Sequence, residues 1–84
     1  MNRPRKIEIK MPLLAPEEPE IEVIRWLVPE GAPVAIDQDL LVLKVDGEEF
    51  LLPSPVEGVL LSRAVEPDEM IATGQVLAVV LETM

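Results

Sequence analysis

Carboxylates are the side chains of this sequence best suited to acid, base or metal chemistry, because the chain contains no cysteine and no histidine. That composition removes thiolate and imidazole ligands, disulfides, and the commonest nucleophile and general base. Glu48 and Glu49 could form an acid and base pair. Neighbours on a strand point to opposite faces, however, so these two do not converge on one substrate.

A second carboxylate grouping lies at Asp37, Gln38 and Asp39. It begins like a calcium loop but lacks the glycine and the later glutamate that complete one. The pattern therefore favours a polar turn over a metal site.

A third grouping, Asp46-Gly47-Glu48, lies where two apolar runs meet. Asp and Gly tolerate the positive φ angles of a primed two-residue turn, so this pair is a strong signal for a β-hairpin. The runs at 40–45 and 49–52 would be its two strands. Lys44 would then lie within the first strand, three residues before the tip.

The sequence on either side of this hairpin repeats after 37 residues. Seven identities support the repeat, more than the roughly two expected from ordinary composition. The pairs are Pro16 with Pro53, Glu20 with Glu57, Val28 with Val65, Ala35 with Ala72, Gln38 with Gln75, Leu40 with Leu77 and Val42 with Val79. The chain therefore predicts two copies of one β unit joined by the hairpin.

Short apolar segments separated by turns follow one another along the chain. Residues 7–11 alternate between apolar and charged side chains, residues 13–19 form a proline-rich loop, and residues 21–28 are rich in β-branched and aromatic side chains. Nine prolines leave few windows for a long helix. About eight short strands in a small closed or sandwiched all-β structure are expected. Trp26 is expected to be mostly buried, in core or edge packing, in preference to stacking on a ligand.

Charge restricts the class of partner. Sixteen acidic residues oppose seven basic ones, for a net charge of −9, and four of the basic residues lie within the first ten positions. Such a surface repels phosphate backbones, which argues against nucleic acid; the charge either keeps a small domain soluble or forms an acidic docking face for a basic protein surface. No segment has the length of a membrane span or the pattern of a signal peptide, so a cytoplasmic location without membrane contact is expected.

Four blocks of the sequence together resemble a lipoyl domain. They are Ile9-Lys10-Met11-Pro12, the segment 23–31, the segment 42–47, and Pro53-Ser54-Pro55-Val56-Glu57-Gly58-Val59-Leu60. The pattern is most similar to the N-terminal domains of dihydrolipoyl acyltransferases, the core subunits of 2-oxoacid dehydrogenase complexes; biotinyl carrier domains are more distant. The resemblance covers nearly all of residues 7–81. It implies a flattened barrel-sandwich hybrid of two roughly four-stranded sheets related by a pseudo-twofold axis.

The tip of the hairpin departs from the family pattern. Lipoyl domains have Asp-Lys-Ala there, and the lysine carries the lipoyl group in amide linkage. Counting back from Pro53, that lysine falls on Gly47, and Asp46-Gly47-Glu48 does not match the Met-Lys-Met of biotinyl domains either. Glycine supplies no amine, and Lys44 is a weak alternative acceptor within a strand.

The resemblance leaves three hypotheses open. The first is a non-catalytic docking or structural module that lacks the acceptor lysine. Such a module would have no cofactor, and its partner would be a subunit of an acyltransferase, dehydrogenase or carboxylase complex. The second is a genuine lipoyl or biotinyl carrier, modified at another lysine or altered at position 47. The third, part of a membrane-fusion adaptor, fits less well, because such proteins typically have a helical insertion in place of the short turn. Under all three hypotheses, residues 1–6 are expected to form a basic arm, residues 7–81 the lipoyl-like domain, and residues 82–84 a C-terminal tail.

Overall fold

The computed structural model describes residues 4–13 and 19–83, which form eight β-strands and no helix. The strands are β1 (Arg5–Lys10), β2 (Ile21–Trp26), β3 (Pro33–Val34), β4 (Asp39–Val45), β5 (Glu48–Pro53), β6 (Gly58–Arg63), β7 (Met70–Ile71) and β8 (Val76–Glu82). They form two four-stranded antiparallel sheets, in the orders β1-β8-β6-β3 and β5-β4-β2-β7. The all-β, two-sheet architecture is thus confirmed, and none of the described residues forms a helix long enough to cross a membrane.

The 37-residue repeat is also a repeat of structure. β2, β3 and β4 begin and end 37 residues before β6, β7 and β8. Even the irregularities match: the register of β2 on β4 shifts between Val23 and Arg25, and that of β6 on β8 shifts between Leu60 and Ser62. The two halves therefore use one folding pattern, with β1 and β5 in equivalent edge positions.

Hydrogen bonds outside the strands follow the same repeat. Gly31 donates its backbone N–H to the carbonyl of Leu60 at 2.7 Å, and Asp68 donates to the carbonyl of Val23 at 2.8 Å. Gly31 and Asp68 are equivalent positions, and both have positive φ, 89° and 71°. Each bond joins one half of the repeat to the other, so the connections hold the two sheets together.

The core lies between the two sheets and consists of aliphatic side chains. Along β2 the more buried side chains alternate with less buried ones, as expected for a sheet with one buried face, whereas four consecutive residues of β4, Leu40 to Leu43, are all buried. The fully buried members with the largest side chains are Met11, Ile21, Leu40, Leu41, Leu43, Leu60 and Leu77. Ser54 is the one fully buried polar residue in the described part of the chain, and its hydroxyl donates to the carbonyl of Val56 at 2.7 Å.

Trp26 is only partly buried and packs against the edge of this core. Its indole N–H donates to the carbonyl of Val65 at 2.9 Å. The guanidinium of Arg63, the repeat equivalent of Trp26, lies 5.7 Å from the ring centroid, within the range of a cation–π interaction. The tryptophan thus has the predicted packing role, at an edge position with one face toward Arg63.

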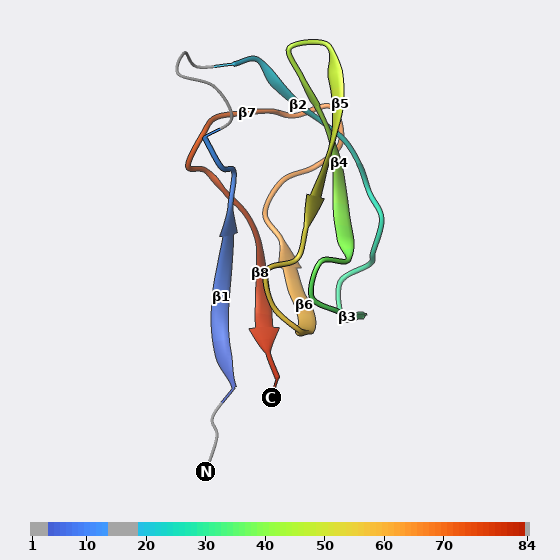
Figure 1. The fold of residues 1–84 in the computed structure, drawn as a ribbon, viewed down its shortest axis with the longest axis vertical. Helices are drawn as coiled ribbons and strands as arrows, with labels where there is room; N and C mark the ends of the chain where they lie inside the picture. Colours follow the sequence, from blue (N-terminus) through green and yellow to red (C-terminus); the bar gives the residue numbers. More distant parts are fainter. Residues whose placement is uncertain (1–3, 14–18, 84) are drawn as a thin grey trace.

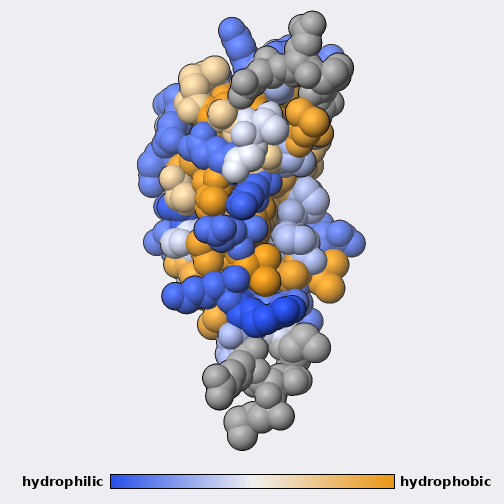
Figure 2. All heavy atoms as spheres, turned by 90° about the vertical axis from the view of Figure 1, so that its left-hand side faces the viewer, coloured by the Kyte–Doolittle hydropathy of each residue, from blue (hydrophilic) through white to orange (hydrophobic). Residues whose placement is uncertain are grey.

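The β4–β5 turn lies at one end of the molecule, whereas β1 begins and β8 ends at the opposite end (Figure 1). At that opposite end Arg5 and Glu82 form an ion pair at 2.9 Å. Seen from the side of β1, the surface mixes hydrophilic and hydrophobic side chains (Figure 2). The hairpin tip therefore lies at the end of the sandwich opposite the start of β1 and the end of β8.

The described residues test the predicted boundaries only in part. β1 starts at Arg5, within the segment 1–6 predicted as an arm, and β8 continues to Glu82, one residue into the predicted tail. Half of the arm, most of the proline-rich loop and the last residue of the tail lie outside the described residues. The division into 1–6, 7–81 and 82–84 stays a prediction.

Candidate functional site at the hairpin tip

The tip of the β4–β5 hairpin is a two-residue turn. Val45 pairs with Glu48, which leaves Asp46 and Gly47 as the loop. Their φ angles are 47° and 85°, both in the left-handed region. This combination defines a type I′ turn, whose twist matches that of the flanking strands. The predicted hairpin is confirmed, and the pair Asp-Gly is the local reason for it.

A second segment holds this turn in place. The backbone N–H of Asp46 donates to the carbonyl of Glu20 at 2.9 Å, and the backbone N–H of Glu20 donates to Oδ1 of Asp46 at 2.9 Å. Glu20 immediately precedes β2, so these two bonds, here called the Glu20 clamp, tie the tip to the neighbouring strand. Sequence reasoning missed Glu20, because the residue acts through its backbone and no side-chain pattern signals that role.

The tip is open to solvent. Asp46, Gly47 and Glu48 are all exposed, and a Cβ placed on Gly47 would have no atom within 4 Å beyond its own chain neighbours. Space therefore does not restrict a side chain at position 47. The restriction comes from the backbone, because a φ of 85° is disfavoured for any residue with a Cβ.

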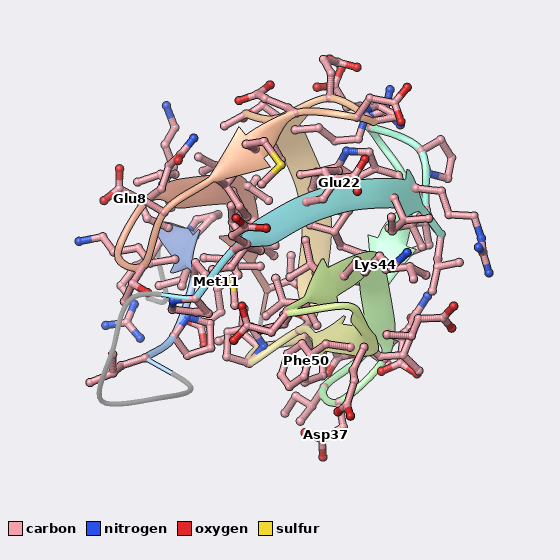
Figure 3. The ribbon with its side chains drawn as sticks, turned by 90° about the horizontal axis from the view of Figure 1, so that it is seen from above. Glu8, Met11, Glu22, Asp37, Lys44 and Phe50 are labelled. Carbon is pink, nitrogen blue, oxygen red and sulfur yellow. The ribbon has the colours of Figure 1, made fainter. Side chains whose placement is uncertain are left out.

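Lys44 lies on the strand next to the turn and is exposed. It stands opposite Glu22 on β2 and Glu49 on β5, so a carboxylate lies on each side of its amine in the sheet. Figure 3, seen from the end that carries the turn, shows Lys44 and Glu22 on adjacent strands, with Phe50 on the strand to the other side of β4. The lysine is thus presented from the face of the sheet and not from the tip.

An open depression of about 260 Å³ lies beside the turn and is lined by Glu20, Glu22, Lys44, Gly47 and Met70. Two of its five residues are acidic and one is basic. It brings Lys44 and Gly47 to one surface, whereas Asp46 and Glu48 line no part of it. Any partner that contacts the tip from this side therefore meets carboxylates, the Lys44 amine and the exposed Met70 together.

The remaining carboxylate groupings show no catalytic or metal-binding geometry. Glu48 and Glu49 are both exposed neighbours on β5. Asp37 has a φ of 68° in a turn, and Gln38 accepts a hydrogen bond from the backbone of Ala35 at 2.9 Å. The interpretation of that segment as a polar turn is confirmed, and no cluster that could hold a metal ion occurs among residues 4–13 and 19–83.

Comparison with known proteins places this architecture in a family. The sequence pattern of the biotin and lipoyl attachment family, described as "Biotin-requiring enzyme", matches residues 7–80. The chain belongs to this family. The tip of its hairpin nonetheless does not fit a covalently held lipoyl or biotinyl group, because Gly47 and its two neighbours carry no side-chain amine.

Several acyltransferases are similar to the chain over most of its length. A dihydrolipoyllysine-residue acetyltransferase component of a pyruvate dehydrogenase complex from Corynebacterium glutamicum is 33% identical over 86% of the chain, and one from Mycobacterium bovis is 37% identical over 83%. A lipoamide acyltransferase component of a branched-chain alpha-keto acid dehydrogenase complex from Pseudomonas putida is 33% identical over 82%. The matched segments are 11%, 13% and 16% of those proteins, so the chain corresponds to a small part of each.

Proposed function

We propose that this chain is a lipoyl-like domain without the acceptor lysine, which acts as a non-catalytic docking or structural module. Gly47 is the observation that carries the proposal. It occupies the second position of an exposed type I′ turn, where the resemblance puts the lysine, and it has no amine to form an amide. The sandwich around it is complete, so the missing feature is one functional group and not the fold.

The setting we propose is an acyltransferase-type multienzyme complex in the cytoplasm. Support comes from the similar proteins, whose names place them in pyruvate and branched-chain dehydrogenase complexes. A carboxylase-type complex is the other candidate, because the family pattern includes biotin-dependent proteins. The net charge of −9 supports a protein partner with a basic surface and argues against nucleic acid.

A carrier modified at Lys44 is the second candidate function. One observation favours it: Lys44 is exposed and shares the depression beside the turn with Gly47. Its position in the strand interior, between Glu22 and Glu49, argues against it, because a ligase that acts on the turn would have to approach across the sheet. Lipoyl or biotin would be its cofactor.

Ligation of the purified protein separates the two candidates. We expect the wild-type chain to gain no mass when incubated with lipoate and a lipoate ligase, or with biotin and a biotin ligase. A mass gain that peptide mapping assigns to Lys44 would contradict the proposal of a non-catalytic module and show that the domain is a carrier.

Restoring the amine tests the tip itself. In the variant Gly47→Lys with Glu48→Ala, we expect partial lipoylation at position 47, because the substitution returns an amine to an exposed turn and removes a charge beside it. The conformational cost of a side chain at this φ is roughly 1 kcal/mol, which a domain with ~5 kcal/mol of stability tolerates. The matched control, Gly47→Ala with Glu48→Ala, has the same strain without the amine and should gain no mass. A folded double variant that stays unmodified would show that ligase recognition has also been lost outside the turn.

A further inference from the structure

The Asp46–Gly47 linkage carries chemistry of its own, independent of any cofactor. In an Asp-Gly sequence the glycine amide nitrogen can attack the aspartate side-chain carbon, because glycine has no Cβ to block the approach. Both residues are exposed, and no atom beyond the two chain neighbours of Gly47 lies within 4 Å of the position its Cβ would take. Glycine therefore has no side chain that opposes ring closure, and no other segment of the described chain crowds this linkage.

The Glu20 clamp opposes the same reaction. Oδ1 of Asp46 accepts the N–H of Glu20 at 2.9 Å, and the N–H of Asp46 donates to the carbonyl of Glu20 at 2.9 Å. These bonds hold the Asp46 carboxylate beside the start of β2. The side chain therefore cannot rotate freely to bring Cγ to the Gly47 nitrogen. Ring closure thus requires that the clamp open first, a local opening of the kind that exposed turns undergo.

We propose that Asp46–Gly47 is a self-modification site, gated by the Glu20 clamp, that converts to isoaspartate through a succinimide. The Gly47 nitrogen forms a bond to Cγ of Asp46, and the carboxyl oxygen leaves as water with the amide proton. Hydrolysis of the succinimide then adds one water molecule. Cleavage of the bond from the Gly47 nitrogen to Cγ restores aspartate, and cleavage of the bond from that nitrogen to the α-carbonyl carbon of residue 46 gives isoaspartate.

Isoaspartate would change the covalent path of the main chain at the tip. The main chain then runs through Cβ of residue 46, which adds one carbon to a turn that has two loop residues. The former α-carbonyl becomes a free carboxylate, so the Oδ1 acceptor of the clamp is no longer presented by the same atoms. Modification would therefore remove both the type I′ geometry and the clamp. This consequence holds whether or not the domain carries a cofactor.

The chain contains its own comparison sites. Asp37 and Asp68 are exposed and have positive φ angles of 68° and 71°, close to the 47° of Asp46. Gln38 and Glu69 follow them, and both have a Cβ. Exposure and backbone conformation are thus similar at three sites, whereas the glycine neighbour occurs at one.

Isoaspartate mapping of the intact protein tests the proposal. The protein is incubated at neutral pH and 37 °C, and isoaspartate is located by digestion and fragmentation mass spectrometry. A synthetic peptide of residues 42–51, which lacks the clamp, is incubated in parallel. We expect isoaspartate at Asp46, little at Asp37 and Asp68, and a rate in the protein about tenfold below that in the peptide, as two ordinary hydrogen bonds would produce.

Variants at Glu20 test the gate. Glu20→Pro removes the N–H donor and should raise the rate toward that of the peptide, whereas Glu20→Ala retains the backbone bonds and should leave the rate unchanged. If Glu20→Pro does not fold, the rate of isoaspartate formation in the wild-type protein relative to the peptide still tests whether the clamp slows the reaction. Equal rates in protein and peptide would overturn the gate, and no excess at Asp46 over Asp37 and Asp68 in the protein would overturn the site.

Discussion

At the scale of single residues, close packing decides where glycine is needed. Gly58 is buried in β6 opposite Glu82, and its repeat equivalent in β2 is the fully buried Ile21. A Cβ on Gly58 would collide with the backbone carbonyl of Leu81 on the neighbouring strand. Position 58 thus excludes a side chain for a steric reason, whereas position 47 at the tip only disfavours one through its backbone angle.

Gly58→Ala should destabilise the fold by at least about 1–3 kcal/mol, the usual cost of overpacking, because the obstacle is a backbone atom that cannot rotate away. Chemical denaturation of the purified variant measures the loss. Glu57→Ala, at the exposed neighbouring position, serves as the control and should change little. A Gly58→Ala variant as stable as the wild type would contradict the packing of β6 against β8.

Trp26→Ala should destabilise the domain by about 3 kcal/mol, at the lower end of the range for a large aromatic side chain, because the ring is only partly buried. The substitution removes packing on the core and the hydrogen bond to Val65. A thermal melt detects the change, and Leu27→Ala, at an exposed neighbour, is the matched comparison. An unchanged melting temperature for Trp26→Ala would exclude a structural role for the ring.

At the scale of the elements, the sequence predicted the hairpin well because turn chemistry is local. Asp46 and Gly47 satisfy the type I′ requirement with their own conformational preferences, so no distant contact is needed to specify the turn. The Glu20 clamp could not be predicted in the same way. It joins the backbone of Glu20 to the backbone and the side chain of Asp46, 26 residues away, and only the assembled sheet brings these groups together.

Gly47→Ala should cost roughly 1 kcal/mol, because it forces a Cβ into the left-handed region without creating any clash. Gly47→Asn should cost less, since asparagine tolerates that conformation best among residues with a Cβ. The difference between the two variants in free energy of unfolding, measured by chemical denaturation, reports the cost of the left-handed backbone conformation at position 47. Equal losses for alanine and asparagine would argue against the type I′ turn.

At the scale of the whole molecule, the repeat made the architecture predictable. Seven identities at a spacing of 37 residues indicated two copies of one unit, and three strands of each half recur at that spacing. The exposure of Trp26 was less accessible to sequence reasoning. Its stacking with Arg63 arises where equivalent positions of the two halves meet, and an alternating strand pattern carries no information on that contact.

The two halves should respond alike to equivalent substitutions. Gln38 accepts the backbone N–H of Ala35 at 2.9 Å, and Gln75 accepts that of Ala72 at 3.0 Å. Gln38→Ala and Gln75→Ala should each cost about 1 kcal/mol, the usual value of one hydrogen bond. Equilibrium unfolding of both single variants is the measurement. A large loss of stability in one variant and none in the other would show that the two halves share a backbone structure but that equivalent hydrogen bonds contribute differently to stability.

The proposal that the domain has no acceptor lysine at position 47 also predicts the mass of the protein. A lipoyl or biotinyl group in amide linkage adds a fixed mass to the chain, and no such linkage can form at glycine. The most direct test is therefore the intact mass of the protein isolated from its native source. We expect the mass calculated from the 84-residue sequence for this segment, without a lipoyl or biotinyl increment. An increment of either kind, mapped to Lys44 or to any other lysine, would contradict the proposal that this domain acts without a covalent cofactor.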